Sequence, residues 1–253
     1  MFDFSNKAVI VTGAGRGIGA GIAIRFAEAG AHIVVNYRTN EASANEVAEK
    51  IKTMGKKAIL IRADVSRHND VESLVKDAVK TFGRIDILIN NAGTYPLSAL
   101  LEMSEDEWNL VINTNLRSVH LCTQAVARQM INQKHEGAII NIASIEGENP
   151  APQHSHYNAA KGGVLMYTRA SAQELGKYNI RVNAVSPGLI WKEGLEKAWP
   201  DGVRRYLKTV PLKRLGYPDD VADTCLFLAS PASRWITGVN LRVDGGMITS
   251  TGY

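Results

Sequence analysis

The amino-acid sequence predicts an α/β protein built on one parallel sheet of seven strands, doubly wound with helices on both faces. Short apolar runs alternate with longer amphipathic segments from one end of the chain to the other. Strands and helices at this spacing form βαβ units with right-handed crossovers, which place helices on both faces of a parallel sheet. Because no internal repeat, low-complexity linker or charge run marks a second domain, we expect a single domain over residues 1–253.

The first half of the chain supplies four of the expected strands. They cover residues 7–12, 32–36, 58–61 and 85–89, which are rich in Ile, Val, Leu and Ala. Amphipathic helices are expected between them over about 18–29, 41–54 and 69–82. Gly30 and Gly55 follow the first two helices, where a glycine commonly ends a helix.

The second half continues the alternation. Ser104 and Glu107 match a capping box, with Ser at the N-cap and Glu three residues later, and predict a long helix to about residue 130. Strands are expected at 138–142, 180–185 and 239–243, and the helix between the first two carries Tyr157.

One stretch, residues 189–216, breaks the rhythm between the last two strands. It is rich in aromatic and basic residues. A long connection that forms its own amphipathic helices is often a binding element. We therefore expect a substrate lid, inserted in the single domain over about 189–216.

Composition excludes several classes of protein. At 253 residues, with 45% hydrophobic and 21% charged residues, the chain is typical of a globular protein. A net charge of +4 without blocks of like charge indicates neither nucleic-acid nor membrane-surface binding. The N-terminus lacks a secretory pattern, and no apolar stretch reaches the ~18 residues of a membrane span, so we expect a cytoplasmic protein. Cys122 and Cys225 are expected to be buried free thiols.

A glycine-rich turn directly follows the first strand, in the run Thr12-Gly13-Ala14-Gly15-Arg16-Gly17-Ile18-Gly19. Dinucleotide sites need glycines for a tight turn, for approach of the backbone to pyrophosphate, and for close packing of helix on strand. The N-terminus of the following helix attracts phosphate. The turn therefore predicts a Rossmann-type nucleotide site.

The end of the second strand indicates which nucleotide is bound. Sites selective for NAD place an Asp or Glu there, which accepts from the ribose hydroxyl and repels a 2′-phosphate. This chain has Asn36, Tyr37 and Arg38 at that point, and Arg16 lies in the glycine turn. Because guanidinium groups bind phosphate through paired, charge-assisted hydrogen bonds, we expect Arg16 and Arg38 to favour NADP(H) over NAD(H). The alternative is that both arginines are solvated surface residues.

Tyr157 and Lys161 lie four residues apart, on one face of a predicted helix. A phenol has a pKa of about 10, and a nearby ammonium lowers it toward the range useful for proton transfer at neutral pH. The pattern alone is common on solvated helices. Here it accompanies the glycine turn and Ser144, thirteen residues before the Tyr.

With these motifs the chain resembles the roughly 250-residue branch of the short-chain dehydrogenase/reductase family, over nearly its whole length. The motifs occur in the family's order and at its spacing. They are Thr12-Gly13…Gly17…Gly19, Asp64-Val65, Asn90-Asn91-Ala92-Gly93, Asn115, Ser144, Tyr157…Lys161, Ser186-Pro187-Gly188 and Val243-Asp244-Gly245-Gly246.

The resemblance implies an oxidoreductase that transfers hydride between a nicotinamide and a ketone or secondary alcohol. Tyr157 would exchange a proton with the substrate oxygen, and Ser144 would hydrogen-bond the same oxygen. Lys161 would lower the pKa of Tyr157 and bind the nicotinamide ribose. Asn115 would hold a relay water that links Lys161 to solvent.

Further cofactor contacts are implied by the same resemblance: adenine would meet Asp64 and Val65, its ribose would meet Asn91 and Gly93, and the carboxamide would meet the backbone of Ile190. One position departs from the family, because Lys192 stands where a cofactor-touching Thr is common. It could reach pyrophosphate or an anionic substrate, or point to water. The predicted cofactor site comprises Gly13, Gly15, Arg16, Gly17, Ile18, Gly19, Asn36, Tyr37, Arg38, Asp64, Val65, Asn91, Ala92, Gly93, Tyr157, Lys161, Pro187, Gly188 and Ile190.

Three functional alternatives stay open. The pattern is similar to 3-oxoacyl-carrier-protein reductases and to glucose-dehydrogenase-like sugar enzymes. The segment 172–174 lacks the basic residue expected to dock an acidic carrier protein, which basic residues of the 189–216 stretch partly offset. A non-catalytic nucleotide sensor on the same fold is the third alternative, although Ser144, Tyr157 and Lys161 are all present.

No metal site is expected. His154 and His156 lie near Glu146 and Glu148, but no further ligand recurs at the usual spacing. These histidines would line the substrate entrance or be solvated.

A homotetramer of D₂ symmetry is expected. The Tyr157 helix carries small and apolar residues over 159–167, more than one sheet face needs to cover. By family likeness, the helices near 104–130 and 156–176 and the last strand would form the contacts. The alternative is a helix fully buried in its own subunit.

Overall fold

The computed structural model describes residues 2–249, and in them a seven-stranded sheet runs in the order β3-β2-β1-β4-β5-β6-β7. All neighbouring strands are parallel, so the predicted α/β fold is confirmed. The carboxyl ends of all the strands therefore meet at one edge. The strands are β1 (Ala8–Val11), β2 (His32–Tyr37), β3 (Ala58–Arg62), β4 (Ile87–Asn90), β5 (Gly137–Ile142), β6 (Ile180–Pro187) and β7 (Asn240–Val243).

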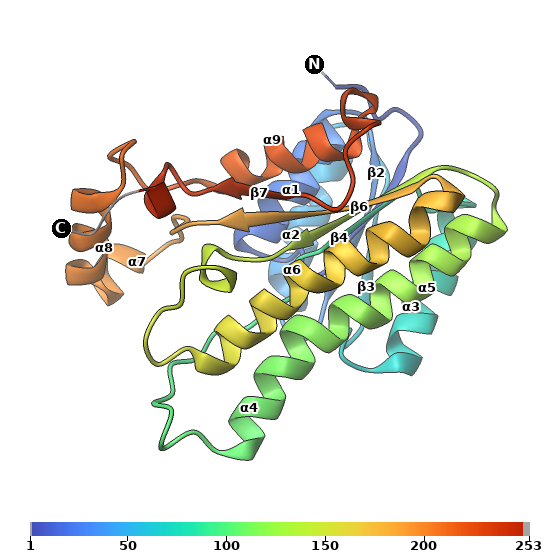
Figure 1. Ribbon diagram of the computed structural model, residues 1–253. Coiled ribbons are helices and arrows are strands. Elements are labelled where there is room, and N and C mark those ends of the chain that lie inside the picture. The colour runs from blue at the N-terminus through green and yellow to red at the C-terminus, as the bar shows by residue number, and fades with distance from the viewer. Residues whose placement is uncertain (1, 250–253) are drawn as a thin grey trace.

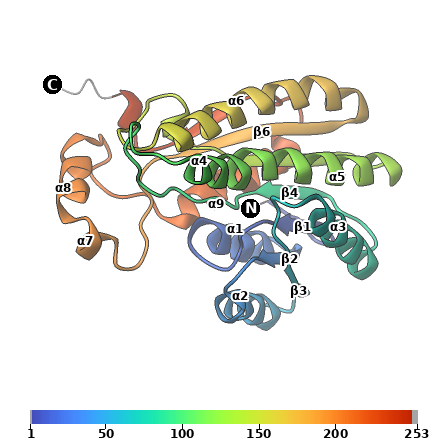
Figure 2. The same ribbon diagram turned by 90° about the horizontal axis from the view of Figure 1, so that it is seen from below.

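Helices cover both faces of the sheet (Figures 1 and 2). One layer consists of α1 (Gly17–Glu28), α2 (Glu41–Thr53) and α9 (Pro218–Ala229), which share one buried cluster with the strands. The other consists of α3 (His68–Phe82), α5 (Ser118–Asn132) and α6 (Ser155–Leu175). Strands buried on both faces read as continuous apolar runs, which is why they could be predicted.

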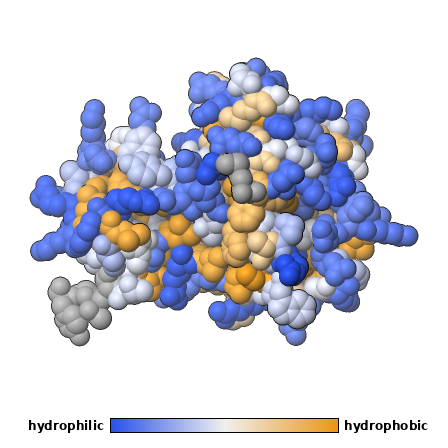
Figure 3. Space-filling view, turned by 90° about the horizontal axis from the view of Figure 1, so that it is seen from above, coloured by the Kyte–Doolittle hydropathy of each residue, from blue (hydrophilic) through white to orange (hydrophobic). Residues whose placement is uncertain are grey.

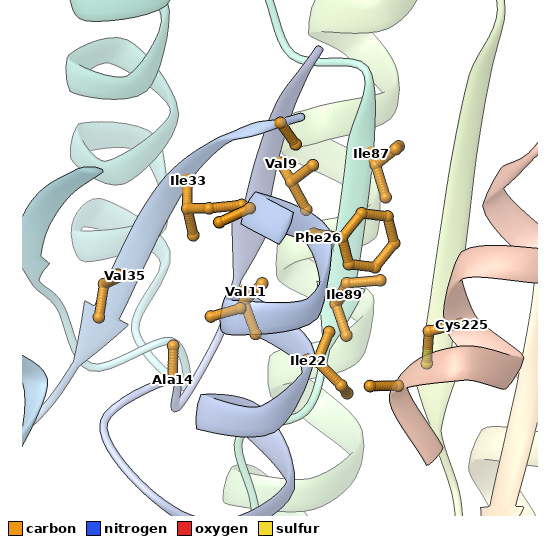
Figure 4. Close-up of a cluster of buried hydrophobic side chains, with 14 of the residues drawn as sticks. Val9, Val11, Ala14, Ile22, Phe26, Ile33, Val35, Ile87, Ile89 and Cys225 are labelled. Carbon is orange, nitrogen blue, oxygen red and sulfur yellow. The ribbon is translucent and has the colours of Figure 1, made fainter. Parts of the chain in front are cut away.

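The core beneath α1 shows how the helices are fixed. Ile22 and Phe26 point from α1 toward Val9 and Ile89 of the central strands (Figure 4). Phe26 is fully buried, and truncating such a side chain to Ala costs about 3–5 kcal/mol. Cys225 of α9 lies in this cluster, and Cys122 of α5 lies in a second buried cluster on the opposite face of the sheet. Both are buried free thiols, as predicted.

The predicted helix from residue 104 to about 130 is present and contains a π-helical turn. Its capping box is present: the Ser104 Oγ accepts from the Glu107 amide at 3.2 Å, and Glu107 accepts from the Ser104 amide at 2.8 Å. The helix runs from α4 (Glu105–Ile112) through a π-helical turn (Asn113–Arg117) into α5 with helical backbone angles at both junctions, so the predicted long helix is confirmed, and the π turn inside it is an addition that the sequence did not indicate. Such turns are rare and are frequent at functional sites. Asn115 lies in this one.

The 189–216 segment folds beyond the carboxyl ends of β6 and β7 (Figure 1). It contains α7 (Leu195–Ala198) and α8 (Pro200–Thr209), which pack around Leu195, Val203 and Leu215 as a small separate cluster. Ile190 pairs with Gly216 at its base. This closed base lets the segment fold as one unit.

The surface is mostly hydrophilic when seen from the side that carries α9, with hydrophobic residues gathered near the middle (Figure 3). Along residues 2–249, every helix is too short or too polar to cross a membrane.

Candidate active site

The glycine turn connects β1 to α1 with the geometry that the motif predicts. Gly13 and Gly17 have φ of +63° and +55°, a region that side chains rarely adopt. A Cβ on Gly19 would lie 2.4 Å from the Asn91 amide nitrogen, so only glycine allows α1 to pack this closely. A Cβ on Gly17 would meet nothing within 4 Å. The backbone at Gly17, the first residue of α1, thus faces open space, which suits a pyrophosphate, whereas Gly15 and Ile18 beside it are half-buried.

The side-chain amides of Asn36, which is buried, and Asn91, which is half-buried, hold this turn in place. The Asn36 Oδ1 accepts from the Gly13 amide at 3.2 Å, and its Nδ2 donates to the carbonyls of Ile61 and Ala63 at 3.2 Å each. The Asn91 Nδ2 donates to the Thr12 carbonyl at 2.9 Å. Both side chains were expected to contact cofactor, but the protein's own backbone already binds them.

The Thr12 hydroxyl completes this support. It accepts from the backbone amides of Asn91 and Ala92 at 2.9 and 3.0 Å. The loop after β4 is therefore bound directly to the glycine turn. Gly93 follows in this loop, where a Cβ would lie 2.6 Å from the Asn115 Oδ1.

Arg16, within the glycine turn, and Arg38, after β2, are both exposed. Arg16 is the N-cap residue of α1, and Arg38 follows β2. Within residues 2–249, neither forms an ion pair. Both guanidinium groups are therefore free to bind a phosphate, whereas the neighbouring Tyr37 is buried.

Asp64 and Val65, which were expected to contact adenine, differ in burial and in hydrogen bonding. Asp64 follows β3 and accepts from the amide and hydroxyl of Ser66 at 3.1 and 2.7 Å. Val65 is only 6% exposed and packs in the core with Val71 and Leu74. Any contact of Val65 with adenine would therefore come from its backbone.

Ser144 and Tyr157 come together just beyond the carboxyl end of β5. Ser144 lies two residues after the strand, and Tyr157 lies in the first turn of α6. Burial raises the pKa of Tyr157, and a hydrogen bond with Ser144 partly opposes that rise. The expected net lowering of this pKa by Lys161 is therefore wrong for the structure as described, because the loss of hydration dominates.

Lys161 is 4% exposed and lies one turn further along α6. Its ammonium donates to the Ile142 carbonyl at 2.7 Å and lies 5.5 Å from the centroid of the Tyr157 ring. Burial lowers the pKa of Lys161 to about 8. A Lys with this pKa can both hold and release a proton near neutral pH.

Asn115 is fully buried in the π turn. Its Nδ2 donates to the carbonyls of Thr94 and Val111 at 2.8 and 2.9 Å, and its Oδ1 accepts from the Thr94 amide at 3.3 Å. The Asn115 side chain thus ties the π turn to the loop after β4.

Pro187, Gly188 and Ile190 lead from β6 into the 189–216 segment. A Cβ on Gly188 would lie 2.5 Å from the Tyr206 hydroxyl, so glycine is needed for α8 to approach. That hydroxyl accepts from the Leu189 amide at 3.2 Å and donates to the Asp244 carbonyl at 3.0 Å. The connection to the segment is therefore well fixed.

Two contacts beside Tyr157 were not predicted. The Lys192 ammonium donates to the Tyr95 hydroxyl at 3.0 Å, joining the 189–216 segment to the loop after β4. The Tyr95 ring lies edge-on to the Tyr157 ring, with 6.0 Å between centroids. His154 pairs with Glu146, Nδ1 to Oε2 at 2.8 Å. Lys192 and Tyr95 are separated by 97 residues, and His154 and Glu146 by 8 residues. No local sequence signal marks either pair.

Residues 2–249 contain no group of three or more His, Cys, Asp and Glu side chains placed to hold a metal ion. His156 is fully buried, and its Nδ1 accepts from the Tyr157 amide at 2.9 Å. It is therefore neither solvated nor at the entrance, contrary to both expectations.

Comparisons with known proteins cover nearly the whole chain. A family model described as Enoyl-(Acyl carrier protein) reductase matches residues 13–248. A 3-oxoacyl-[acyl-carrier-protein] reductase FabG of Staphylococcus epidermidis is 42% identical over 242 residues, covering 96% of this chain and 99% of that protein.

Solved structures share the fold. A short-chain type dehydrogenase/reductase from Mycobacterium marinum has a TM-score of 0.92 at 39% identity, covering 97% of each chain. A 7α-hydroxysteroid dehydrogenase, complexed with NADH and a 7-oxo bile acid, has a TM-score of 0.92 at 35% identity, covering 96% of this chain and 95% of that one.

The glycine turn, the parallel sheet and these full-length similarities lead to one conclusion. The chain belongs to the short-chain dehydrogenase/reductase family, as an NAD(P)-dependent oxidoreductase that acts on keto and hydroxyl groups.

Proposed function

We propose that this protein is an NADP(H)-dependent reductase of ketones, or a dehydrogenase of secondary alcohols in the reverse direction, with Tyr157 as the general acid/base. The observation that carries the proposal is the meeting of Ser144, Tyr157 and Lys161 at the edge of the sheet where the strands end. When bound, the nicotinamide supplies or accepts the hydride.

The side chains would divide the proton chemistry among them. Tyr157 stays protonated because burial raises its pKa, so its hydroxyl can donate to the oxygen of a ketone undergoing reduction. Ser144 would hydrogen-bond the same oxygen and stabilise its developing negative charge. Lys161, with a pKa of about 8, would return the proton to Tyr157.

The preference for NADP(H) is supported by the two free arginines. Arg16 and Arg38 are exposed beside the glycine turn, and β2 ends in Asn36 and Tyr37 without a carboxylate that would repel a 2′-phosphate. A 3-oxoacyl thioester is a second candidate substrate, favoured by the 42% identity to a 3-oxoacyl-[acyl-carrier-protein] reductase over nearly the whole chain.

A substrate panel tests this function. Simple ketones, hydroxy ketones, aldoses and an acetoacetyl thioester would be offered with NADPH and with NADH, and oxidation of the nicotinamide followed by absorbance. We expect ketone-dependent oxidation that is faster with NADPH at equal concentration. Oxidation of neither cofactor by any member of the panel would contradict the proposal.

We also infer that the enzyme works as a homotetramer. Met166 of α6 is 61% exposed, and Trp108 and Leu110 of α4 are 39% and 48% exposed. A hollow of about 580 Å³ lies between α6 and β7, which is an edge strand of the sheet. Closed symmetric assembly would cover these apolar residues and this edge. Light scattering should give about four times the 27.5 kDa of one chain, and a mass near 27.5 kDa would contradict the inference.

A further inference from the structure

A histidine–carboxylate pair stands beside the proposed acid/base. Glu146 lies in the short 3₁₀ turn after Ser144, and His154 is the N-cap residue of α6. The His154 Nδ1 lies 2.8 Å from the Glu146 Oε2, and the side chains are only 12% and 24% exposed. The pair is therefore held between two elements and partly shielded from water.

This pair contacts both Ser144 and Tyr157. The Glu146 amide donates to the Ser144 Oγ at 3.1 Å. The imidazole of His154 lies 5.5 Å from the Tyr157 ring, centroid to centroid, with the planes tilted by 56°. A substrate whose carbonyl oxygen reaches Ser144 and Tyr157 would therefore have its neighbouring atoms close to His154.

The chemistry of His154 indicates what those atoms would be. Because Nδ1 faces a carboxylate, it carries the proton, and Nε2 of the neutral ring is then a hydrogen-bond acceptor. The His154 Nε2 is buried and has no partner among the described residues. A buried acceptor without a partner is unfavourable, and a ligand hydroxyl would satisfy it. A carbonyl oxygen would not, since it has no proton to donate.

We propose that His154, oriented by Glu146, accepts a hydrogen bond from a hydroxyl on the carbon next to the reacting carbonyl, and so selects α-hydroxy ketones. In the reverse direction the substrates would be vicinal diols. The hydroxyl keeps its proton throughout: hydride goes to the carbonyl carbon and the Tyr157 proton to the carbonyl oxygen. This inference rests on the proposed function and narrows its substrate class.

The test compares two ketones that differ by one hydroxyl. The kcat/KM of the wild type with NADPH would be measured for 1-hydroxybutan-2-one and butan-2-one. We expect a preference of about 10- to 100-fold for the hydroxy ketone. In His154→Phe, which keeps an aromatic ring against Tyr157, the preference should fall to less than about threefold through loss of activity on the hydroxy ketone alone. His68→Gln, at an exposed position at the start of α3, is the matched control.

Two changes at Glu146 separate orientation of His154 from mere support of the loop. Glu146→Gln keeps an oxygen that can accept from Nδ1, so it should retain most of the preference. Glu146→Leu removes that oxygen and should abolish the preference. Equal losses on both ketones in either His154→Phe or Glu146→Leu would show a purely structural pair and overturn the proposal.

Binding gives a result that does not depend on turnover. Dissociation constants of butane-1,2-diol and butan-2-ol would be measured on the wild type and on His154→Phe, each with NADP⁺. Tighter binding of the diol to the wild type, lost in His154→Phe, supports the proposal. It does so even if the wild type reduces neither ketone. That absence of reduction would count against the proposed function alone. Equal binding of the two alcohols to the wild type overturns the proposal, whatever the panel of ketones shows.

Discussion

On the glycine-turn side of the site the polar side chains have hydrogen-bond partners within the protein, whereas on the Tyr157 side several lack them. Beside the glycine turn, Asn36 and Asn91 are bound to backbone atoms of the protein. On the Tyr157 side, several buried polar atoms lack a partner. Those that the described residues leave without one all lie within 154–158, and they are His154 Nε2, Ser155 Oγ, His156 Nε2 and Asn158 Oδ1.

This difference indicates how the two sides recognise their ligands. The nucleotide side is built before any ligand arrives, so it offers backbone amides at the start of α1 and two free guanidinium groups. The Tyr157 side keeps the His154 Nε2 without a protein partner, at a cost in stability, for a group that a substrate brings. Substitutions on the first side should therefore change stability or cofactor choice, and those on the second should change turnover or substrate choice.

The largest expected effect is on turnover. Tyr157→Phe keeps the ring in its place but removes the transferable proton, so kcat should fall about 10²–10⁴-fold. The dissociation constant of NADPH, measured by fluorescence titration, should stay nearly unchanged. Tyr178→Phe, at a 42% exposed position at the far end of α6, is the control. A Tyr157→Phe enzyme with wild-type kcat would refute the assignment.

The free energy of unfolding should depend on pH because the Lys161 ammonium is buried. Its pKa of about 8 lies below the ordinary 10.5, so its contribution to stability is present above pH 10.5 and is lost as the pH falls through about 8. The free energy of unfolding of the ligand-free protein should therefore rise between these pH values.

Lys161→Met should remove this pH dependence. Below pH 8 the variant should be more stable than the wild type by about 1–3 kcal/mol, although its kcat should fall about 10²-fold or more. Urea unfolding at several pH values measures the first effect. A variant less stable than the wild type at pH 7 would show that the bond to the Ile142 carbonyl outweighs the burial.

On the nucleotide side, some substitutions should change cofactor preference and others should change stability. Arg38→Ala or Arg16→Ala should weaken NADPH binding by roughly 10–150-fold, leave NADH binding nearly unchanged, and not alter stability. Asn36→Ala should instead lower the free energy of unfolding by about 1–3 kcal/mol and weaken both cofactors alike. Equal wild-type dissociation constants for NADPH and NADH would contradict the proposal that these arginines bind the 2′-phosphate.

The smallest effect is expected at the exposed contact between Lys192 and Tyr95. The Lys192 ammonium also lies 5.2 Å from the centroid of the Tyr95 ring, and such a cation–π contact is worth about 0.5–1 kcal/mol at an exposed site. Lys192→Met should therefore raise the KM for the ketone by about two- to fivefold and leave kcat unchanged. A KM increase of a hundredfold would instead mean that Lys192 binds the substrate or the cofactor directly.

Most of the fold could be predicted from the sequence because it depends on local sequence patterns. The strands are continuous apolar runs, Gly30 and Gly55 end helices with φ of +107° and +73°, and the capping box at Ser104 is present. The π turn at Asn115 could not be predicted, because it depends on bonds to Thr94, 21 residues away.

The site was predictable to the same extent. The run from Tyr157 to Lys161 is a local motif, and it does meet Ser144 in the structure. The internal roles of Asn36 and Asn91 were missed because their partners lie 23 to 79 residues away. Burial also reversed the expected pKa of Tyr157, and a sequence pattern carries no measure of desolvation at one atom.

The division between the two sides is tested most directly by a double-mutant cycle of Arg38→Ala and His154→Phe. The kcat/KM for 1-hydroxybutan-2-one would be measured with NADPH in the wild type, both single variants and the double variant. If one side binds only the cofactor and the other only the substrate, the two losses multiply, and their free energies add to within about 0.5 kcal/mol. A coupling energy above about 1 kcal/mol would contradict the account.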